Sequence, residues 1–156
     1  MVNLQLVEIG RDGNPAENLP LTDITRSVSE AMTNVYRQSG FVRPWIGYFA
    51  VQDGRIIGTC GFKSPPQGGR VEIAYGTLGD EGRGIATQMA RHLIEMARAD
   101  DISVRIVAQT LPEESASTTI LRKLGFSHTA TVQHATDGEV WEWSLPEATN
   151  PQTPIA

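Results

Sequence analysis

The chain has 156 residues, of which 40% are hydrophobic and 20% are charged, with a formal net charge of −5 and a pI of about 5.1. This length and composition are typical of a single globular domain that can bury a substantial core. The acidic balance argues against general affinity for nucleic acid, which requires a basic face, and it mildly favours neutral or cationic partners.

Composition also limits the chemistry. Cys60 is the single cysteine, so neither an internal disulfide nor a cysteine-rich metal site is expected. The three histidines are not spaced like metal ligands, and we predict no metal ion. No signal-peptide pattern opens the chain, and no apolar run is long enough to span a bilayer. We therefore expect a cytoplasmic protein without a membrane partner.

Hydrophobic patterns divide the chain into alternating strands and helices. In chain order we predict a strand at 3–9, a helix at 24–38, a hairpin of strands 46–52 and 55–62, a strand at 71–78, a long helix after Gly84, a strand at 103–109, a helix at 113–124, and strands at 126–134 and 139–145. This order predicts a mixed α/β sheet in one domain over residues 1–145. Residues 146–156 contain three prolines without an apolar pattern and are predicted to be a disordered tail.

A glycine-rich turn precedes the long helix. Gly82 and Gly84 flank Arg83, and glycine lets the backbone approach a ligand closely. The helix that follows presents unpaired N–H groups and the positive end of its dipole, which together favour a bound phosphate. Arg83 adds a fixed positive charge. The turn is not a P-loop, because Ile85 follows its last glycine, and Thr87 breaks the dinucleotide-binding pattern. A turn without a ligand is the alternative.

The residues around this turn resemble a known family. The order VEIAY, EGRGIAT, a helix and VRIVAQTLPEESASTTILRKLGF resembles the GNAT superfamily of acetyl-CoA-dependent N-acetyltransferases. The likeness covers about residues 45–145 and is closest to the ribosomal-protein N-terminal acetyltransferase branch. It implies an α/β (α+β) fold with a mixed seven-stranded sheet, a splay between strands 4 and 5, and helices on both faces. The sequence departs from the family's turn at Gly79, where Arg or Gln is usual.

The resemblance also implies a binding site for acetyl-CoA as the co-substrate. It places the pantetheine arm in the splay, with backbone contacts from Gly76 and Thr77. Strand alternation puts Tyr75 on the face opposite Glu72, where it is expected to pack against the core or the cofactor. It places the pyrophosphate on the turn before the helix. The implied cofactor-binding residues are Tyr75, Gly76, Thr77, Gly82, Arg83, Gly84, Ile85, Ala86 and Thr87.

Glu72 is the candidate catalytic base. It lies in an apolar strand, on the same face as Ala74 and Gly76, which are small and leave room beside it. A carboxylate in that setting is partly desolvated, which makes it a better base for an amine. By position it matches a glutamate that often acts as the base in the resembled superfamily. The alternative is a solvent-facing residue or an ion pair with Arg70 or Arg105.

Ser117 is the candidate that protonates the leaving thiolate. In the ribosomal-protein branch a serine at this position lies near the cofactor sulfur, whereas many other members use a tyrosine where this chain has Leu121. The neighbouring Ser115, Thr118 and Thr119 are alternative hydroxyls. Ser117 could equally occupy the first turn of its helix for structural reasons. The family often has an asparagine at 114 or 115, and this chain has Glu114 and Ser115 instead.

Two functions fit these residues. The first is an N-acetyltransferase that moves an acetyl group from acetyl-CoA to a primary amine of a small molecule or peptide. The second is a non-catalytic acyl-CoA-binding or sensory module, suggested by Leu121 and Gly79. Trp45, Tyr48, Trp141 and Trp143 suggest an acceptor pocket, core packing or a homodimer contact. Cys60 is expected to be a small buried residue and not a nucleophile.

Overall fold

The computed structural model describes residues 4–79 and 84–146. Gly82 and Arg83 of the predicted phosphate turn lie outside the described residues, and so does the predicted tail from residue 147 onward. None of the helices in the described ranges is long and apolar enough to cross a membrane.

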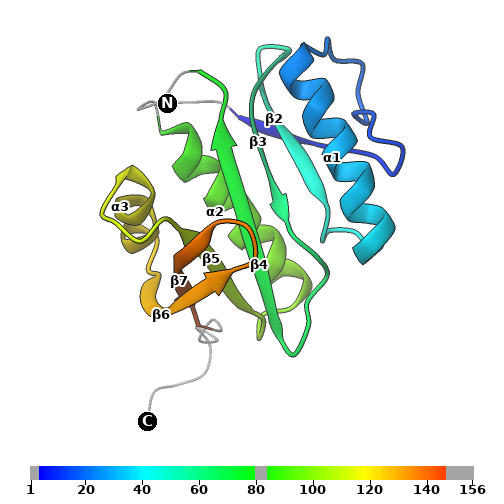
Figure 1. The fold of residues 1–156 in the computed structure, drawn as a ribbon. Helices are drawn as coiled ribbons and strands as arrows, with labels where there is room; N and C mark the ends of the chain where they lie inside the picture. Colours follow the sequence, from blue (N-terminus) through cyan, green and yellow to red (C-terminus); the bar gives the residue numbers. More distant parts are fainter. Residues whose placement is uncertain (1–3, 80–83, 147–156) are drawn as a thin grey trace.

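Seven strands form one sheet with three helices around it (Figure 1). The elements are β1 (Gln5–Glu8), α1 (Asp23–Ser39), β2 (Gly47–Gln52), β3 (Arg55–Phe62), β4 (Arg70–Thr77), α2 (Ile85–Asp100), β5 (Arg105–Thr110), α3 (Ala116–Lys123), β6 (Ser127–His134) and β7 (Gly138–Leu145). The strand order across the sheet is β1-β2-β3-β4-β5-β7-β6.

The sheet opens in its middle. All neighbouring strands are antiparallel except β4 and β5, which are parallel and pair only from Arg70–Glu72 to Arg105–Val107. Beyond that point β4 continues against β3 as far as Thr77, and β5 continues against β7 as far as Thr110. The two halves therefore diverge after Glu72, and the predicted splay between strands 4 and 5 is confirmed.

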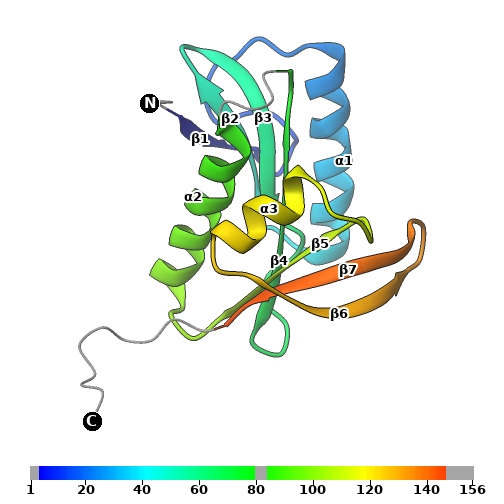
Figure 2. The ribbon, with the colours of Figure 1, turned by 90° about the vertical axis from the view of Figure 1, so that its left-hand side faces the viewer.

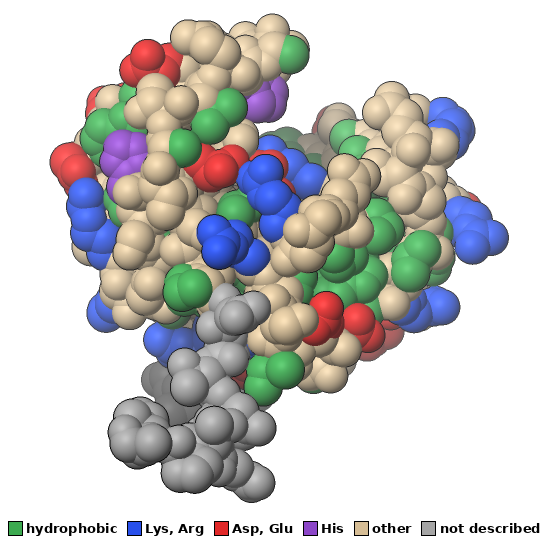
Figure 3. Space-filling view, turned by 90° about the horizontal axis from the view of Figure 1, so that it is seen from below, with side chains coloured by type: hydrophobic (Ala, Val, Ile, Leu, Met, Phe, Trp, Pro, Cys, Tyr) green, Lys and Arg blue, Asp and Glu red, His purple; other side chains and the backbone are tan. Residues whose placement is uncertain are grey.

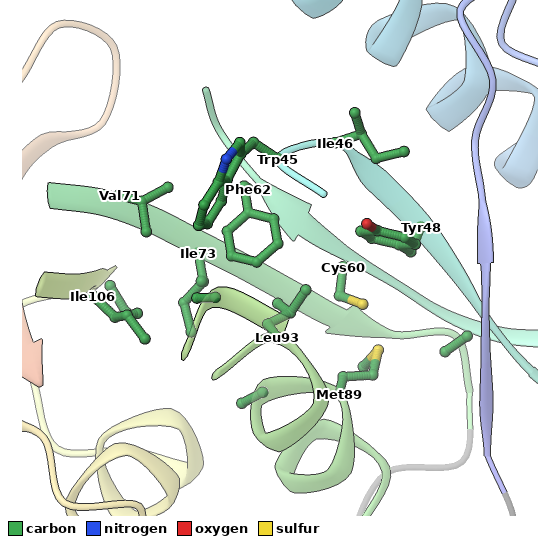
Figure 4. Close-up of a cluster of buried hydrophobic side chains, with 14 of the residues drawn as sticks. Trp45, Ile46, Tyr48, Cys60, Phe62, Val71, Ile73, Met89, Leu93 and Ile106 are labelled. Atoms are coloured by element: carbon green, nitrogen blue, oxygen red, sulfur yellow. The ribbon is translucent and has the colours of Figure 1, made fainter. Parts of the chain in front are cut away.

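Helices cover both faces of the sheet, as predicted. Figure 2 shows α1 on one side of the central strands and α2 and α3 on the other. Buried side chains from several strands and from α2 meet in the larger hydrophobic core (Figure 4). A smaller core on the α1 side contains Val7, Ile9, Phe49 and Val51, against which Val28 and Met32 of α1 pack. The face of the sheet that α1 covers thus has the smaller hydrophobic core.

A buried tyrosine fixes α1 to the sheet. The Tyr36 hydroxyl donates to the carbonyl oxygen of Ile9 at 2.7 Å and accepts from the N–H of Gly47 at 3.0 Å. Both partners are backbone groups that would otherwise be buried without a hydrogen bond, which costs about 1–3 kcal/mol for each group. The bonds hold the C-terminal half of α1 at a defined height over β2.

The largest boundary difference from the sequence prediction is at the start of the third helix. The third helix begins at Ala116, not 113, because the Ser115 side chain accepts from the Thr118 N–H and the Thr118 hydroxyl accepts from the Ser115 N–H. This reciprocal pair is a capping box that marks the helix start. In α2, His92 and Met96 are only half-buried. The fully covered stripe is Ile85, Met89, Ala90, Leu93 and Ala97.

Charges are intermixed on the face shown in Figure 3, where acidic and basic side chains lie beside one another. Ion pairs join Lys63 to Glu72 at 2.6 Å and Arg70 to Glu142 at 2.8 Å. Paired charges of this kind cancel locally, and so they do not produce the continuous basic surface that a nucleic acid requires.

Two glycines in adjacent strands give a matched stability test. A Cβ at Gly61 would lie 2.7 Å from the Ile46 carbonyl oxygen and 2.8 Å from the Gly47 Cα, whereas a Cβ at Gly76 would meet nothing within 4 Å. We expect Gly61→Ala to lower the free energy of unfolding by about 1–3 kcal/mol, because backbone must move. We expect Gly76→Ala to cost nothing. Urea denaturation measures both, and equal effects would contradict the packing described for β2 and β3.

Candidate active site

Three connected hollows surround the end of β4, and Tyr75 lines all of them. The largest is a groove of about 670 Å³ between β4, the start of α2 and the start of α3. Its walls are Tyr75, Gly76, Thr77, Gly84, Ile85, Ala86, Thr87, Ala116, Ser117, Thr119 and Ile120. The groove therefore brings together all the predicted cofactor residues that the structure describes.

The groove ends at a helix N-terminus without a side-chain cap. Gly84 is the N-cap of α2 and has φ of 74°, in the left-handed region that favours glycine. The other two helices are capped by the side chains of Thr22 and Ser115. A glycine has no side chain to accept from the first-turn N–H groups of α2, which leaves them available to an anion.

The second hollow is the splay itself. It measures about 110 Å³ and begins where the pairing of Glu72 with Val107 ends. Lys63, which follows β3, and residues of β4, β5 and α3 enclose it; the latter are Glu72, Ile73, Ala74, Tyr75, Ala108, Gln109, Thr110, Ser117 and Leu121. Both candidate catalytic side chains, from elements far apart in the sequence, thus border one small space.

Glu72 is both ion-paired and open to this space. Its side chain is 20% exposed, and Lys63 Nζ lies 2.6 Å from its Oε2. The partners considered from sequence were wrong, because Arg70 pairs with Glu142, and Arg105 is not the group that contacts Glu72. Lys63 follows β3 directly and was missed, since only the β3–β4 register brings it beside Glu72.

Ser117 is the exposed second residue of α3 and lines both the groove and the splay. Ser117 lies in the first turn of this helix, as the structural alternative had it, but the residue that caps the helix is Ser115. The hydroxyls of Thr118 and Thr119 are engaged elsewhere: that of Thr118 donates to the Glu114 carboxylate, and that of Thr119 to the Ser115 carbonyl oxygen. Leu121 is fully buried at the base of the splay.

Glu114 occupies a position where the resembled family often has asparagine, and here its side chain stabilises α3. Its carboxylate accepts from both terminal nitrogens of Arg122, at 2.5 and 2.9 Å, and from the Thr118 hydroxyl at 3.0 Å. These hydrogen bonds, those of Arg122 first, lower the pKa of Glu114 to about 2. The carboxylate therefore stays ionised and ties the start of α3 to its last turn.

Tyr75 supplies a second hydroxyl-bearing side chain. It is half-buried, and burial raises its pKa to about 12, so the phenol stays protonated at neutral pH. A protonated phenol can donate a hydrogen bond. Alternation had placed Tyr75 on the face opposite Glu72, and its packing against the larger core agrees with that expectation.

The third hollow lies on the α1 side of the sheet and measures about 310 Å³. It is lined by Ile9, Val28, Met32, Gly47, Thr59, Cys60, Gly61, Phe62, Ala74, Tyr75 and Gly76. The aromatic residues considered for an acceptor pocket do not line it. Trp45, Tyr48 and Trp143 are buried in the larger core instead, which was the alternative left open from sequence.

Cys60 is buried, and burial raises its pKa to about 12. A thiol with that pKa is protonated at neutral pH and is a poor nucleophile. Within residues 4–79 and 84–146, no group of three or more His, Cys, Asp or Glu side chains is arranged to hold a metal ion.

The fold and this arrangement combine a splayed sheet with a glycine-capped helix N-terminus that is suited to an anion. A sequence model of the Acetyltransferase (GNAT) domain family matches residues 14–127. Because the match spans most of the chain, the protein belongs to the GNAT family and is an acetyltransferase. No curated protein sequence is significantly similar to it.

Solved structures share the fold at low sequence identity. Ribosomal-protein-S5-alanine acetyltransferase from Vibrio fischeri is 14% identical over 83% of this chain and 78% of that chain, with a TM-score of 0.62. RimL, a ribosomal L7/L12 alpha-N-protein acetyltransferase, in complex with coenzyme A is 19% identical over 81% and 73%, with a TM-score of 0.62. Aminoglycoside acetyltransferase AAC(6')-Ib with coenzyme A is 22% identical over 65% of each chain, with a TM-score of 0.55.

We expect Cys60 to be inert in the folded protein. Because its pKa is raised to about 12, the thiolate population at mildly alkaline pH is small, and it grows only when unfolding returns the pKa to its ordinary range. Alkylation by iodoacetamide should be slower than in the unfolded chain by more than about 10³-fold. Mass spectrometry with and without guanidinium measures the ratio, and rapid alkylation of the native protein would contradict the assignment.

Proposed function

We propose that this protein transfers the acetyl group of acetyl-CoA to a primary amine of a small molecule or peptide by direct attack, with Glu72 as the base. The observation that carries the proposal is the end of β4–β5 pairing at Glu72. That point puts a half-buried carboxylate at the opening through which the groove reaches the other face of the sheet.

The groove residues fit the co-substrate. We assign the pyrophosphate to the uncapped N-terminus of α2, with Gly84, Ile85, Ala86 and Thr87 contributing, and with Gly82 and Arg83 completing the turn. Beyond Glu72, the edge of β4 that faces β5 lacks a strand partner among the described residues. Its backbone groups can therefore bond to the amides of the pantetheine arm, with contacts at Tyr75, Gly76 and Thr77.

The reaction has three parts. Glu72 takes a proton from the acceptor ammonium, directly or through water, and frees the nitrogen lone pair. The nitrogen attacks the thioester carbonyl carbon, forming the C–N bond, while backbone N–H groups of the β4 edge stabilise the developing oxyanion. The C–S bond then breaks, the nitrogen releases its second proton to solvent, and the Ser117 hydroxyl gives its proton to the thiolate and recovers one from solvent. No acyl-enzyme is formed.

The Lys63 ammonium keeps the Glu72 carboxylate in place before the amine arrives. At 2.6 Å from Oε2 and half-exposed, Lys63 can swing into solvent as the acceptor enters. Water then replaces the contact that the Lys63 ammonium loses.

Other features of the proposal concern partners and location. Two of the similar structures are ribosomal-protein acetyltransferases, which supports a peptide amine as one acceptor class. A homodimer stays a prediction, although Trp143, one of the residues that suggested it, is fully buried within the chain. We also propose a cytoplasmic location, since acetyl-CoA-dependent transfer requires access to that co-substrate.

We expect Glu72→Gln to lower kcat by about 10²- to 10⁴-fold, because it removes the proton acceptor while keeping shape. Binding of acetyl-CoA, followed by calorimetry, should not change. The matched control is Glu142→Gln, because Glu142 is also ion-paired and is 17% exposed against 20% for Glu72, but lines none of the three hollows. If the two variants lose activity equally, Glu72 is not the base.

Ser117 and Ser115 are expected to separate catalysis from stability. Ser117→Ala should lower kcat by up to about 10²-fold without lowering the melting temperature, since Ser117 is not the helix cap. Ser115→Ala should instead lower the free energy of unfolding by about 1 kcal/mol. Steady-state kinetics beside thermal melts of both variants measure this, and full activity of Ser117→Ala would show that solvent protonates the thiolate.

A further inference from the structure

The hollow on the α1 side is apolar on almost every wall. Val28 and Met32 of α1, together with Ile9, supply apolar side chains to its lining. Among the described residues that line it, none carries a charge. Thr59 is a polar residue on the same strand face as Gly61, whereas the side chains of Cys60 and Tyr75 pack in the larger core on the other face of the sheet. A polyamine or aminoglycoside would have to leave several ammonium groups unpaired here, which is unfavourable.

The space exists because the sheet has small residues beneath α1. Gly47 pairs with Gly61 and Gly61 with Ala74, so three neighbouring strands present almost no side chain to this side. The floor cannot be filled by simple substitution, since a Cβ at Gly61 would lie 2.7 Å from a backbone oxygen. Met32 lies directly over Gly47, with its Cε 2.8 Å from where a Cβ would be. Its thioether is unbranched and can adapt to the shape of an apolar group.

The hollow is continuous with the proposed site of transfer. Ala74, Tyr75 and Gly76 line it on one side of β4, Tyr75 and Gly76 line the groove, and Ala74 and Tyr75 line the splay. Glu72 lies on the same strand face as Ala74 and Gly76. An amine whose apolar part fills the hollow would thus have its nitrogen directed toward the splay and the Glu72 carboxylate.

We propose that this hollow is the acceptor pocket and that it selects primary amines whose amine-bearing end carries one uncharged apolar side chain. The inference rests on the proposed function and names its substrate class. A volume of about 310 Å³ corresponds to roughly ten water molecules, which suffices for one branched or aromatic side chain with its amino group. Longer acceptors extend into solvent. The apolar walls also disfavour the ammonium form of the bound amine, which helps Glu72 to deprotonate it.

The test compares acceptors that share one α-amine and differ in side chain. Leucinamide, methioninamide and phenylalaninamide are set against serinamide and lysinamide, with spermidine and kanamycin as polycations, and CoA release is followed. We expect kcat/KM for the apolar amides to exceed that for serinamide by about 10- to 100-fold, the range that apolar side-chain burial gives in enzyme specificity. Comparable rates for serinamide or spermidine would overturn the inference.

Substitutions in α1 test whether the preference for apolar amines arises in this pocket. Val28→Asp puts a charge on the pocket wall and should reduce kcat/KM for leucinamide by at least about tenfold, while acetyl-CoA affinity stays unchanged. Ala31→Asp is the matched control, because Ala31 is exposed on the same helix and does not line the pocket. Val28→Phe, which keeps the wall apolar but fills space, should penalise phenylalaninamide more than methioninamide. Equal behaviour of Val28→Asp and Ala31→Asp would place acceptor recognition elsewhere.

Measuring how an acceptor amine binds in the absence of acetyl-CoA separates this inference from the proposed function. Saturation-transfer NMR with leucinamide and the protein alone should show contact that serinamide lacks and that Val28→Asp removes. If acetyl-CoA does not bind but leucinamide does, the proposed function fails and the apolar pocket stands. If acetyl-CoA binds and no apolar amine contacts the protein, the pocket inference fails and the acetyl-CoA site stands.

Discussion

The short stretch of pairing between β4 and β5 is the constraint on which the rest of the structure depends. The two strands pair over three residues each and then follow different partners, β3 for β4 and β7 for β5. Leu121 of α3 is fully buried at the base of the opening and helps to keep the strands apart. Buried backbone N–H and C=O groups are almost always paired, so an open edge inside a sheet is stable only where solvent or a ligand bonds to it.

This opening joins two unlike surfaces of the sheet. On the side of α2 and α3 lies a groove that ends at a glycine-capped helix, suited to an anionic and elongated molecule. On the side of α1 lies a smaller apolar pocket floored by glycine and alanine. Tyr75 borders both, and Glu72 lies at the margin of the passage between them. Transfer between two substrates needs this arrangement, because the reacting atoms must meet while the rest of each molecule stays apart.

Sequence reasoning recovered the features that are local in the chain. Alternation in 71–78 put Glu72, Ala74 and Gly76 on one face, and the glycines of 82–84 indicated a turn before α2, where Gly84 is the left-handed N-cap; the anion site there stays a prediction. The family resemblance supplied the splay, which no local pattern encodes. What could not be predicted depends on strand register. The Lys63–Glu72 contact and the pocket floor of Gly47 and Gly61 come from residues of different strands that only the folded sheet brings together.

Amide hydrogen exchange of β4 tests the central claim most directly. The claim is that acetyl-CoA bonds to the open edge of β4 beyond Glu72, in the groove that leads to the acceptor pocket. Exchange of the amides in 73–77 should slow when acetyl-CoA is added, while that of 70–72, in the part of β4 that lies against β5, should change little. If acetyl-CoA binds and exchange in 73–77 is unaltered, the splay is not where the thioester is held.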